Sequence, residues 1–382
     1  MIFLIFFLQL VVTPDLQKTP VFKPQTIDST ITIGYGIALG DVDGDKKPDI
    51  LLADKKQIVW YRNGDWKKFV MAENLTEYDN VCIAAEDIDR DGKVEVAVGA
   101  QWNPSETKDE KKSGSVHFLI RPKDPTTEWK SVKLYHEVTI HRMRWVRSSD
   151  GSYYLLVLPL HGKDNTNGTG TPVNLLVFKY PQLLKKAESE HIISTNMHLT
   201  HNFDITDSRQ APIVIAGKEG LSVSQRVFKD LHLVTLPMRG FEGAGEVRLP
   251  RSGTEKFITT IEPMHGNKLV VYSDEGQTRL VLDTSLSEGH ALAAADLLGT
   301  GSSQIVAGWR RPNKDGKVGV KIYSKKTAAS TDWDNQWIDE NGMACEDLQV
   351  LDMNGDKRLD IVASGRATHN LKIYWNMTPS AR

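Results

Sequence analysis

The sequence predicts an all-β, seven-bladed propeller with four-stranded blades, in which an N-terminal strand closes the last blade. Three observations lead to this prediction: a strand–turn–strand unit that recurs along the chain, a scarcity of amphipathic helices, and a spare strand before the first unit. A supersecondary unit that recurs at a fixed spacing is typical of solenoids and propellers.

The recurring unit pairs two apolar strands around a polar turn. It is clearest in residues 38–54, 84–101, 293–310 and 350–366. The residues that head these four turns are Asp41, Asp87, Asp296 and Asp352. The long gap between the second and third copies has room for three weaker units, headed by Arg147, Asp207 and Arg251. The chain therefore holds seven units at a mean spacing of roughly 50 residues.

Further strands follow the first two in each unit. The third strands are predicted at residues 57–61, 115–120, 175–180, 269–273, 318–324 and 371–375, and a fourth strand is exemplified by residues 66–72. The last unit ends near Asn376 without a fourth strand, whereas residues 21–27 precede the first unit. A pair of β-sandwiches or an open solenoid is the alternative, but radial closure accounts for equal units and for the spare strand.

Composition restricts the class of function. The formal net charge is −2, and no block of basic residues alternates with aromatic residues, so we expect no nucleic-acid partner. The N-terminal apolar run is too short to span a bilayer and resembles the apolar region of a signal peptide. We therefore expect a signal peptide over residues 1–18, export to the periplasm or exterior, no membrane span, and one propeller domain over residues 19–382.

Three turns carry oxygen-bearing side chains at alternate positions, as a hard cation such as Ca²⁺ requires. They are Asp41, Asp43, Asp45 and Asp49; Asp87, Asp89, Asp91 and Glu95; and Asp352, Asn354, Asp356 and Asp360. This spacing resembles the cation loops of FG-GAP and VCBS repeats. Alternatively, these side chains hydrogen-bond the backbone of their own turn and hold no ion. In both cases the role is structural.

The opposite face of the propeller gathers histidines. Six residues upstream of the turn heads stand Tyr35, Val81, His141, His201, Gly245, His290 and Glu346. At the end of the second strands stand Lys55, Gln101, His161, Lys218, His265, Arg310 and Arg366. Antiparallel pairing places the start of one strand beside the end of the next, so both sets are expected around one mouth of the central channel.

Converging neutral imidazoles are typical ligands of Zn²⁺, and a catalytic zinc keeps one position open for water or substrate. We predict His141, His201 and His290 as the ligands, although Mn, Fe, Co or Ni would also suit them. The candidates for a fourth ligand, a base or substrate binding are Glu346, His265, His161, His369, Arg310, Arg366, Lys218 and Tyr35.

Residues 287–311 and 345–376 resemble the propeller domain of the aldos-2-ulose dehydratase family and related VCBS-repeat proteins. The resemblance implies a zinc ion at the bottom of the propeller cleft, where a keto-sugar such as 1,5-anhydrofructose or glucosone loses water. The corresponding residues here are His290, Arg310, Glu346, Arg366 and His369. That family continues into cupin and lectin-like domains, which follow no such segment here, so the resemblance extends to the elimination half-reaction alone.

The resulting hypothesis is a zinc-dependent lyase that acts by β-elimination on a keto-sugar or keto-glycoside. Zinc would polarise the substrate carbonyl, Glu346 or a histidine would take the adjacent proton, and the arginines would orient the sugar. Two alternatives remain open. One is a non-catalytic, calcium-stabilised propeller that binds glycans or proteins, and the other is a metal-independent polysaccharide lyase that works through histidine, arginine and Tyr35.

Overall fold

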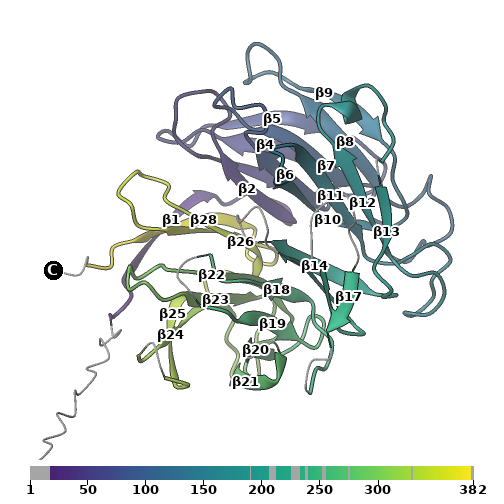
Figure 1. Cartoon of the computed structure of the whole chain (residues 1–382). Helices are drawn as coiled ribbons and strands as arrows, with labels where there is room; N and C mark the ends of the chain where they lie inside the picture. The colour runs from purple at the N-terminus through teal and green to yellow at the C-terminus, as the bar shows by residue number, and fades with distance from the viewer. Residues whose placement is uncertain are drawn as a thin grey trace, which may run out of the picture.

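Seven four-stranded antiparallel sheets form the molecule, arranged as blades around a ring (Figure 1). The computed structural model describes residues 18–189, 191–205, 212–224, 233–236, 240–251, 255–273, 276–327 and 330–379. Within these residues the sole helical element is the short 3₁₀ helix η1 (Gln182–Leu184), and there is no helix that could span a membrane. The predicted fold class is therefore confirmed.

Blades 1 to 6 each run from an inner to an outer strand in chain order. Blade 1 is β2 (Gly36–Gly40), β3 (Asp49–Ala53), β4 (Gln57–Tyr61) and β5 (Lys68–Glu73). Blade 2 is β6 (Cys82–Glu86), β7 (Glu95–Ala100), β8 (Ser115–Ile120) and β9 (Lys130–Leu134). Blade 3 is β10 (Ile140–Arg147), β11 (Tyr153–Pro159), β12 (Asn174–Lys179) and β13 (His191–Ser194).

Blade 4 is β14 (Thr200–Ile205), β15 (Ile213–Gly217), β16 (Leu221–Ser224) and β17 (Leu233–Leu236). Blade 5 is β18 (Glu246–Arg248), β19 (Ile258–Glu262), β20 (Lys268–Ser273) and β21 (Thr278–Asp283). Blade 6 is β22 (Gly289–Ala295), β23 (Gln304–Trp309), β24 (Gly319–Lys325) and β25 (Trp333–Glu340). The turn head predicted at Asp207 lies outside the described residues, as does almost all of the predicted signal peptide.

The N-terminal strand closes the ring, as predicted. Blade 7 has the order β1 (Phe22–Asp28), β28 (Asn370–Asn376), β27 (Asp360–Gly365) and β26 (Cys345–Leu351). β1 pairs antiparallel with β28 from Phe22↔Asn376 onward, so the last blade takes its outer strand from the start of the chain. This pairing also covers the edge that β28 would otherwise expose.

The hydrophobic core lies between neighbouring blades. Leu51 and Trp60 of blade 1, for example, belong to one buried cluster with Val96 and Val98 of blade 2. Each middle strand contacts a neighbouring blade on both faces, which explains why β3 reads as a continuous apolar run and is buried throughout.

Buried tyrosines add polar links between blades. In three places a tyrosine on the third strand of one blade donates its hydroxyl hydrogen to an aspartate on the outer strand of the preceding blade. The pairs, each at 2.7 Å, are Tyr61–Asp28, Tyr323–Asp283 and Tyr374–Asp339. A lysine ammonium lies within 3.4 Å of each aspartate, so every buried carboxylate has a hydroxyl and a cation as partners.

Candidate functional site

The predicted histidine register is present on the inner strands. His141, His201 and His290 occupy equivalent positions near the starts of β10, β14 and β22, and Glu346 has the same position on β26. The pairing of each of these four strands shifts register at that residue, which is left unpaired. A β-bulge redirects a side chain, and here it marks the four candidate residues of the site.

Hydrogen bonds between blades fix the imidazole rings. The Nδ1 atom of His141 lies 2.7 Å from the carbonyl oxygen of His201, and Nδ1 of His201 lies 2.9 Å from that of Gly245. Nδ1 of His290 is 2.6 Å from the carbonyl oxygen of Glu346. A carbonyl oxygen can only accept, so Nδ1 carries the hydrogen in each ring and Nε2 keeps its lone pair.

His265 completes a cluster of three ligand nitrogens. It lies in the turn between β19 and β20 with a φ of 52°, and its Nε2 is 2.7 Å from Nε2 of His201. The ligand atoms of His201, His265 and His290 all lie within 4.8 Å of one another. His141 packs beside this trio, with its ring centroid 4.4 Å from that of His201. Two of the three predicted ligands thus belong to the trio, and His265 takes the place expected for His141.

The donor set fits a divalent transition-metal ion. Burial holds the pKa values of His201 and His290 well below their ordinary value, and it lowers the pKa of His265 to about 2. Neutral imidazoles with a free Nε2 are the form that binds a metal. The carbonyls on Nδ1, together with Glu246 at 3.3 Å from Nδ1 of His201, supply the outer partners that orient such ligands.

Glu346 is the acid–base candidate beside the trio. Its side chain is 2% exposed, and its carboxylate lies 3.0 Å from Nη1 of Arg366 and 3.5 Å from Nη1 of Arg310. Its Oε2 is buried and has no hydrogen-bond partner among the described residues. Burial raises the pKa of Glu346, whereas the two arginines oppose that rise.

The other predicted residues occupy different surroundings. The Tyr35 hydroxyl donates to Asp79 at 3.1 Å, and the guanidinium of Arg366 lies 5.3 Å above the Tyr35 ring. His161 pairs as an isolated bridge with the opposing loop, and Lys218 and His369 are exposed. Thus Tyr35, Arg310 and Arg366 adjoin Glu346, and none of His161, Lys218 and His369 joins the cluster of ligand nitrogens.

The carboxylate turns display the backbone hydrogen bonds of the second alternative. Asp41 accepts from the amides of Gly44 and Lys46 at 2.6 and 2.7 Å, and Asp352 accepts equivalently from Gly355 and Lys357 at 2.8 and 2.7 Å. Two turns also bring three carboxylates within 4.8 Å: Asp41, Asp43 and Asp45, and Asp87, Asp89 and Glu95. Among the described residues the third turn forms no such group, and calcium at these turns stays a prediction.

Three arginines near the trio escaped the sequence reasoning. Arg142 follows His141 directly, Arg144 lies two residues further along β10, and Arg248 lies on β18. Their signal was available, because each falls within three residues of the histidine register. The register was read at a single position, however, and its neighbours on the inner strands were not considered.

The comparisons with known proteins support the fold. Residues 41–98, which contain the first two carboxylate turns, match the family model of the FG-GAP-like repeat. No curated protein matches the sequence. Similar solved structures include a chain of the mitotic checkpoint complex, with a TM-score of 0.61 and 10% identity over 100% of this chain and 98% of that one.

Two further solved structures are similar. BBS1N, crystallised in complex with ARL6DN, has a TM-score of 0.61 and 12% identity over 96% of this chain and 99% of that one. The extracellular domain of the putative one-component system BT4673 from B. thetaiotaomicron has a TM-score of 0.53 and 11% identity, over 92% of this chain and 39% of that one. At such identities the likeness concerns the fold alone. The chain is therefore a seven-bladed β-propeller with an FG-GAP-like repeat at residues 41–98.

Proposed function

We propose that this protein is a metal-dependent lyase that performs β-elimination on a keto-sugar or keto-glycoside at the histidine mouth of its channel. The observation that carries the proposal is the cluster of His201, His265 and His290, whose ligand nitrogens lie within 4.8 Å of one another beside the buried Glu346. A purely structural cluster of histidines would have no need of a buried carboxylate with an unbonded oxygen at its side.

The roles follow from the positions of the side chains. His201, His265 and His290 would hold the ion, with zinc as the first candidate. When bound, such an ion polarises a substrate carbonyl and thereby acidifies the adjacent C–H bond. Glu346 takes that proton, the electron pair of the C–H bond forms the new C=C bond, and the β C–O bond breaks. The proton on Glu346 can then pass to the departing oxygen, which leaves as water or an alcohol.

The arginines and Tyr35 would position the sugar. Arg310 and Arg366 carry donors beside Glu346, where negative charge develops on the substrate oxygen during elimination. Arg366 also covers the Tyr35 ring, and its side chain is 38% exposed, so it can reach a molecule that enters from the histidine face.

The test measures metal content and elimination together. Purified, tag-free protein should contain about one transition-metal ion per chain, measured by mass spectrometry, and keto-sugars should yield a product with the ultraviolet absorbance of a conjugated C=C–C=O group. His265→Ala should lose both metal and activity, whereas His369→Ala, outside the cluster, should keep both. Full metal and activity in His265→Ala would refute the assignment.

A non-catalytic binding propeller is the second candidate. One observation favours it: two of the similar solved structures are of complexes, namely the mitotic checkpoint complex and BBS1N with ARL6DN. Such a binder would need Ca²⁺ at the carboxylate turns but no ion at the histidines. Protein that contains calcium alone, or no metal, would therefore favour the binding function.

Export is a part of the proposal that rests on the N-terminal sequence. We propose that residues 1–18 act as a signal peptide and that the propeller works in the periplasm or outside the cell. Expression of the full chain, cell fractionation and N-terminal sequencing of the product would test this. Protein retained in the cytoplasm with an intact N-terminus would contradict it.

A further inference from the structure

The central channel contains a cavity of about 510 Å³ next to the histidine layer. Its lining runs along the inner strands, from Tyr35 near the histidine mouth to Glu86 and Leu351 near the carboxylate turns. None of the three clustered histidines lines it. Its volume falls in the range of small-molecule binding sites, which is roughly 300–1,000 Å³.

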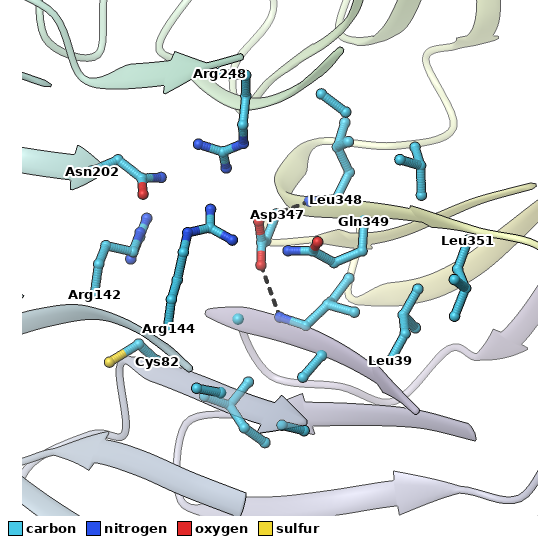
Figure 2. A pocket seen from close by; sticks show the side chains of 18 of the residues that line it. Leu39, Cys82, Arg142, Arg144, Asn202, Arg248, Asp347, Leu348, Gln349 and Leu351 are labelled. Carbon is cyan, nitrogen blue, oxygen red and sulfur yellow. Dashed lines mark hydrogen bonds between the residues drawn. The ribbon is translucent and has the colours of Figure 1, made fainter. Parts of the chain in front are cut away.

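Three guanidinium groups point into this cavity from different strands. Figure 2 shows Arg142 and Arg144 extending from one side and Arg248 from the other, so that their charged ends face one another. The side chains are 14%, 23% and 8% exposed, respectively. Each donates an N–H to a main-chain carbonyl, at 3.2, 3.0 and 2.7 Å, and these bonds hold the groups in place without neutralising them.

The nearby carboxylates pair loosely with these arginines. Nη2 of Arg142 lies 4.0 Å and Nη2 of Arg248 lies 3.3 Å from Glu246, while Nη2 of Arg144 is 3.7 Å from Asp204. Charge-assisted hydrogen bonds between such groups are normally about 2.7–2.9 Å long. The guanidinium forks therefore lack the close, two-pronged carboxylate contact for which their geometry is suited.

Positive charge exceeds negative charge inside the cavity. The charged residues in its lining are four arginines, the fourth being Arg251, against Glu86 and Asp347. Glu86 is exposed, and burial raises the pKa of Asp347. Burial, with repulsion from Arg248 and Arg251 as further contributions, lowers the pKa of Arg144 to about 10. Crowding of cations in a desolvated space is costly unless an anion joins them.

We propose that Arg142, Arg144 and Arg248, termed the arginine chamber below, form an oxyanion-binding site that is separate from the histidine cluster. The ligand is a carboxylate, sulfate or phosphate group, because planar guanidinium forks match the oxygen pairs of these groups. The oxyanion is either a free inorganic ion or the acidic group of a sugar small enough for the cavity. The inference does not depend on the lyase proposal, since it requires neither a metal nor a reaction.

The first experiment is calorimetric titration of the full chain with sulfate, phosphate and glucuronate, each at constant ionic strength in a chloride buffer. We expect binding of at least one of the three at a single site. Removal of one charge-assisted contact in Arg248→Gln should weaken that binding by roughly tenfold to a hundredfold. Arg121→Gln is the matched control, because Arg121 is equally half-buried but pairs with Asp91 and Glu95 outside the chamber.

A second measurement needs no variant and therefore does not depend on folding of the mutant. Phenylglyoxal modifies accessible arginines, and peptide mass spectrometry locates the modified positions. The anion that binds should protect the chamber arginines and leave Arg62, an exposed arginine, unprotected. Binding of sulfate or phosphate alone identifies a free oxyanion as ligand, and binding of glucuronate alone identifies a sugar acid. No heat with any of the three, or equal binding in Arg248→Gln without protection of the chamber, would overturn the proposal.

Discussion

At the scale of single residues, Glu346 connects burial with the proposed chemistry. A general base acts in its deprotonated form, and burial raises the pKa of Glu346 above the ordinary value of a glutamate. Elimination should therefore disappear as the pH falls through this raised pKa. Glu346→Gln should lower the rate by about 10²–10⁴-fold and leave the metal content unchanged. The measurements are a pH–rate profile and metal analysis, and a variant with the wild-type rate would rule out Glu346 as the base.

Arg366 should tune the same pH dependence. Its charge, 3.0 Å from Glu346, opposes the rise of the Glu346 pKa, so Arg366→Gln should move the acidic limb of the pH–rate profile to higher pH. Arg358→Gln serves as the control, because Arg358 pairs with Asp356 at a carboxylate turn and should leave the profile where it was. A shift to lower pH in Arg366→Gln would contradict this reading of the ion pair.

His117 provides a test of acid stability away from the candidate site. It is 5% exposed on β8, between the hydroxyls of Ser115 and Ser131, and burial lowers its pKa to about 4. The unfolded chain takes up its proton near pH 6.5 while the folded chain does not, so stability is lost as the pH falls from 6.5 towards 4. The loss amounts to about 3 kcal/mol at most. Denaturant unfolding should show a weaker pH dependence in His117→Gln, and none of that change in His191→Gln, which alters an exposed histidine.

At the scale of elements, the sequence predicted strands more reliably than it predicted the details of the site. β4 and β8 have the predicted bounds, since an apolar strand between polar turns is a local signal. The bulges at His141, His201, His290 and Glu346 are not local, because they depend on register with the neighbouring strand. The pairing of His265 with His201, from different blades, likewise follows from the curvature of the ring and not from spacing.

The tyrosine links are the element-scale contacts whose removal is easiest to measure. Tyr61→Phe keeps the ring in the core but deprives Asp28 of a donor at 2.7 Å. A buried carboxylate that loses one hydrogen bond costs about 1–3 kcal/mol, so the midpoint of urea unfolding should fall accordingly. Tyr78→Phe, a change at a 38% exposed tyrosine, should leave the midpoint unaltered. Equal midpoints for both variants would show that the link between blades 7 and 1 contributes little.

At the scale of the whole molecule, closure of the ring depends on one strand from the start of the chain. Removal of residues 1–28 deletes β1, exposes the edge of β28 and breaks the link from Asp28 to Tyr61. We expect this truncation to lose several kcal/mol of stability and to self-associate, whereas removal of residues 1–17 should leave the melting temperature unchanged. A synthetic peptide of residues 18–30 should bind the truncated chain and restore its thermal stability. If the truncated chain instead melts like the intact one and stays monomeric, the remaining blades close without β1, and the ring is held by contacts between blades alone.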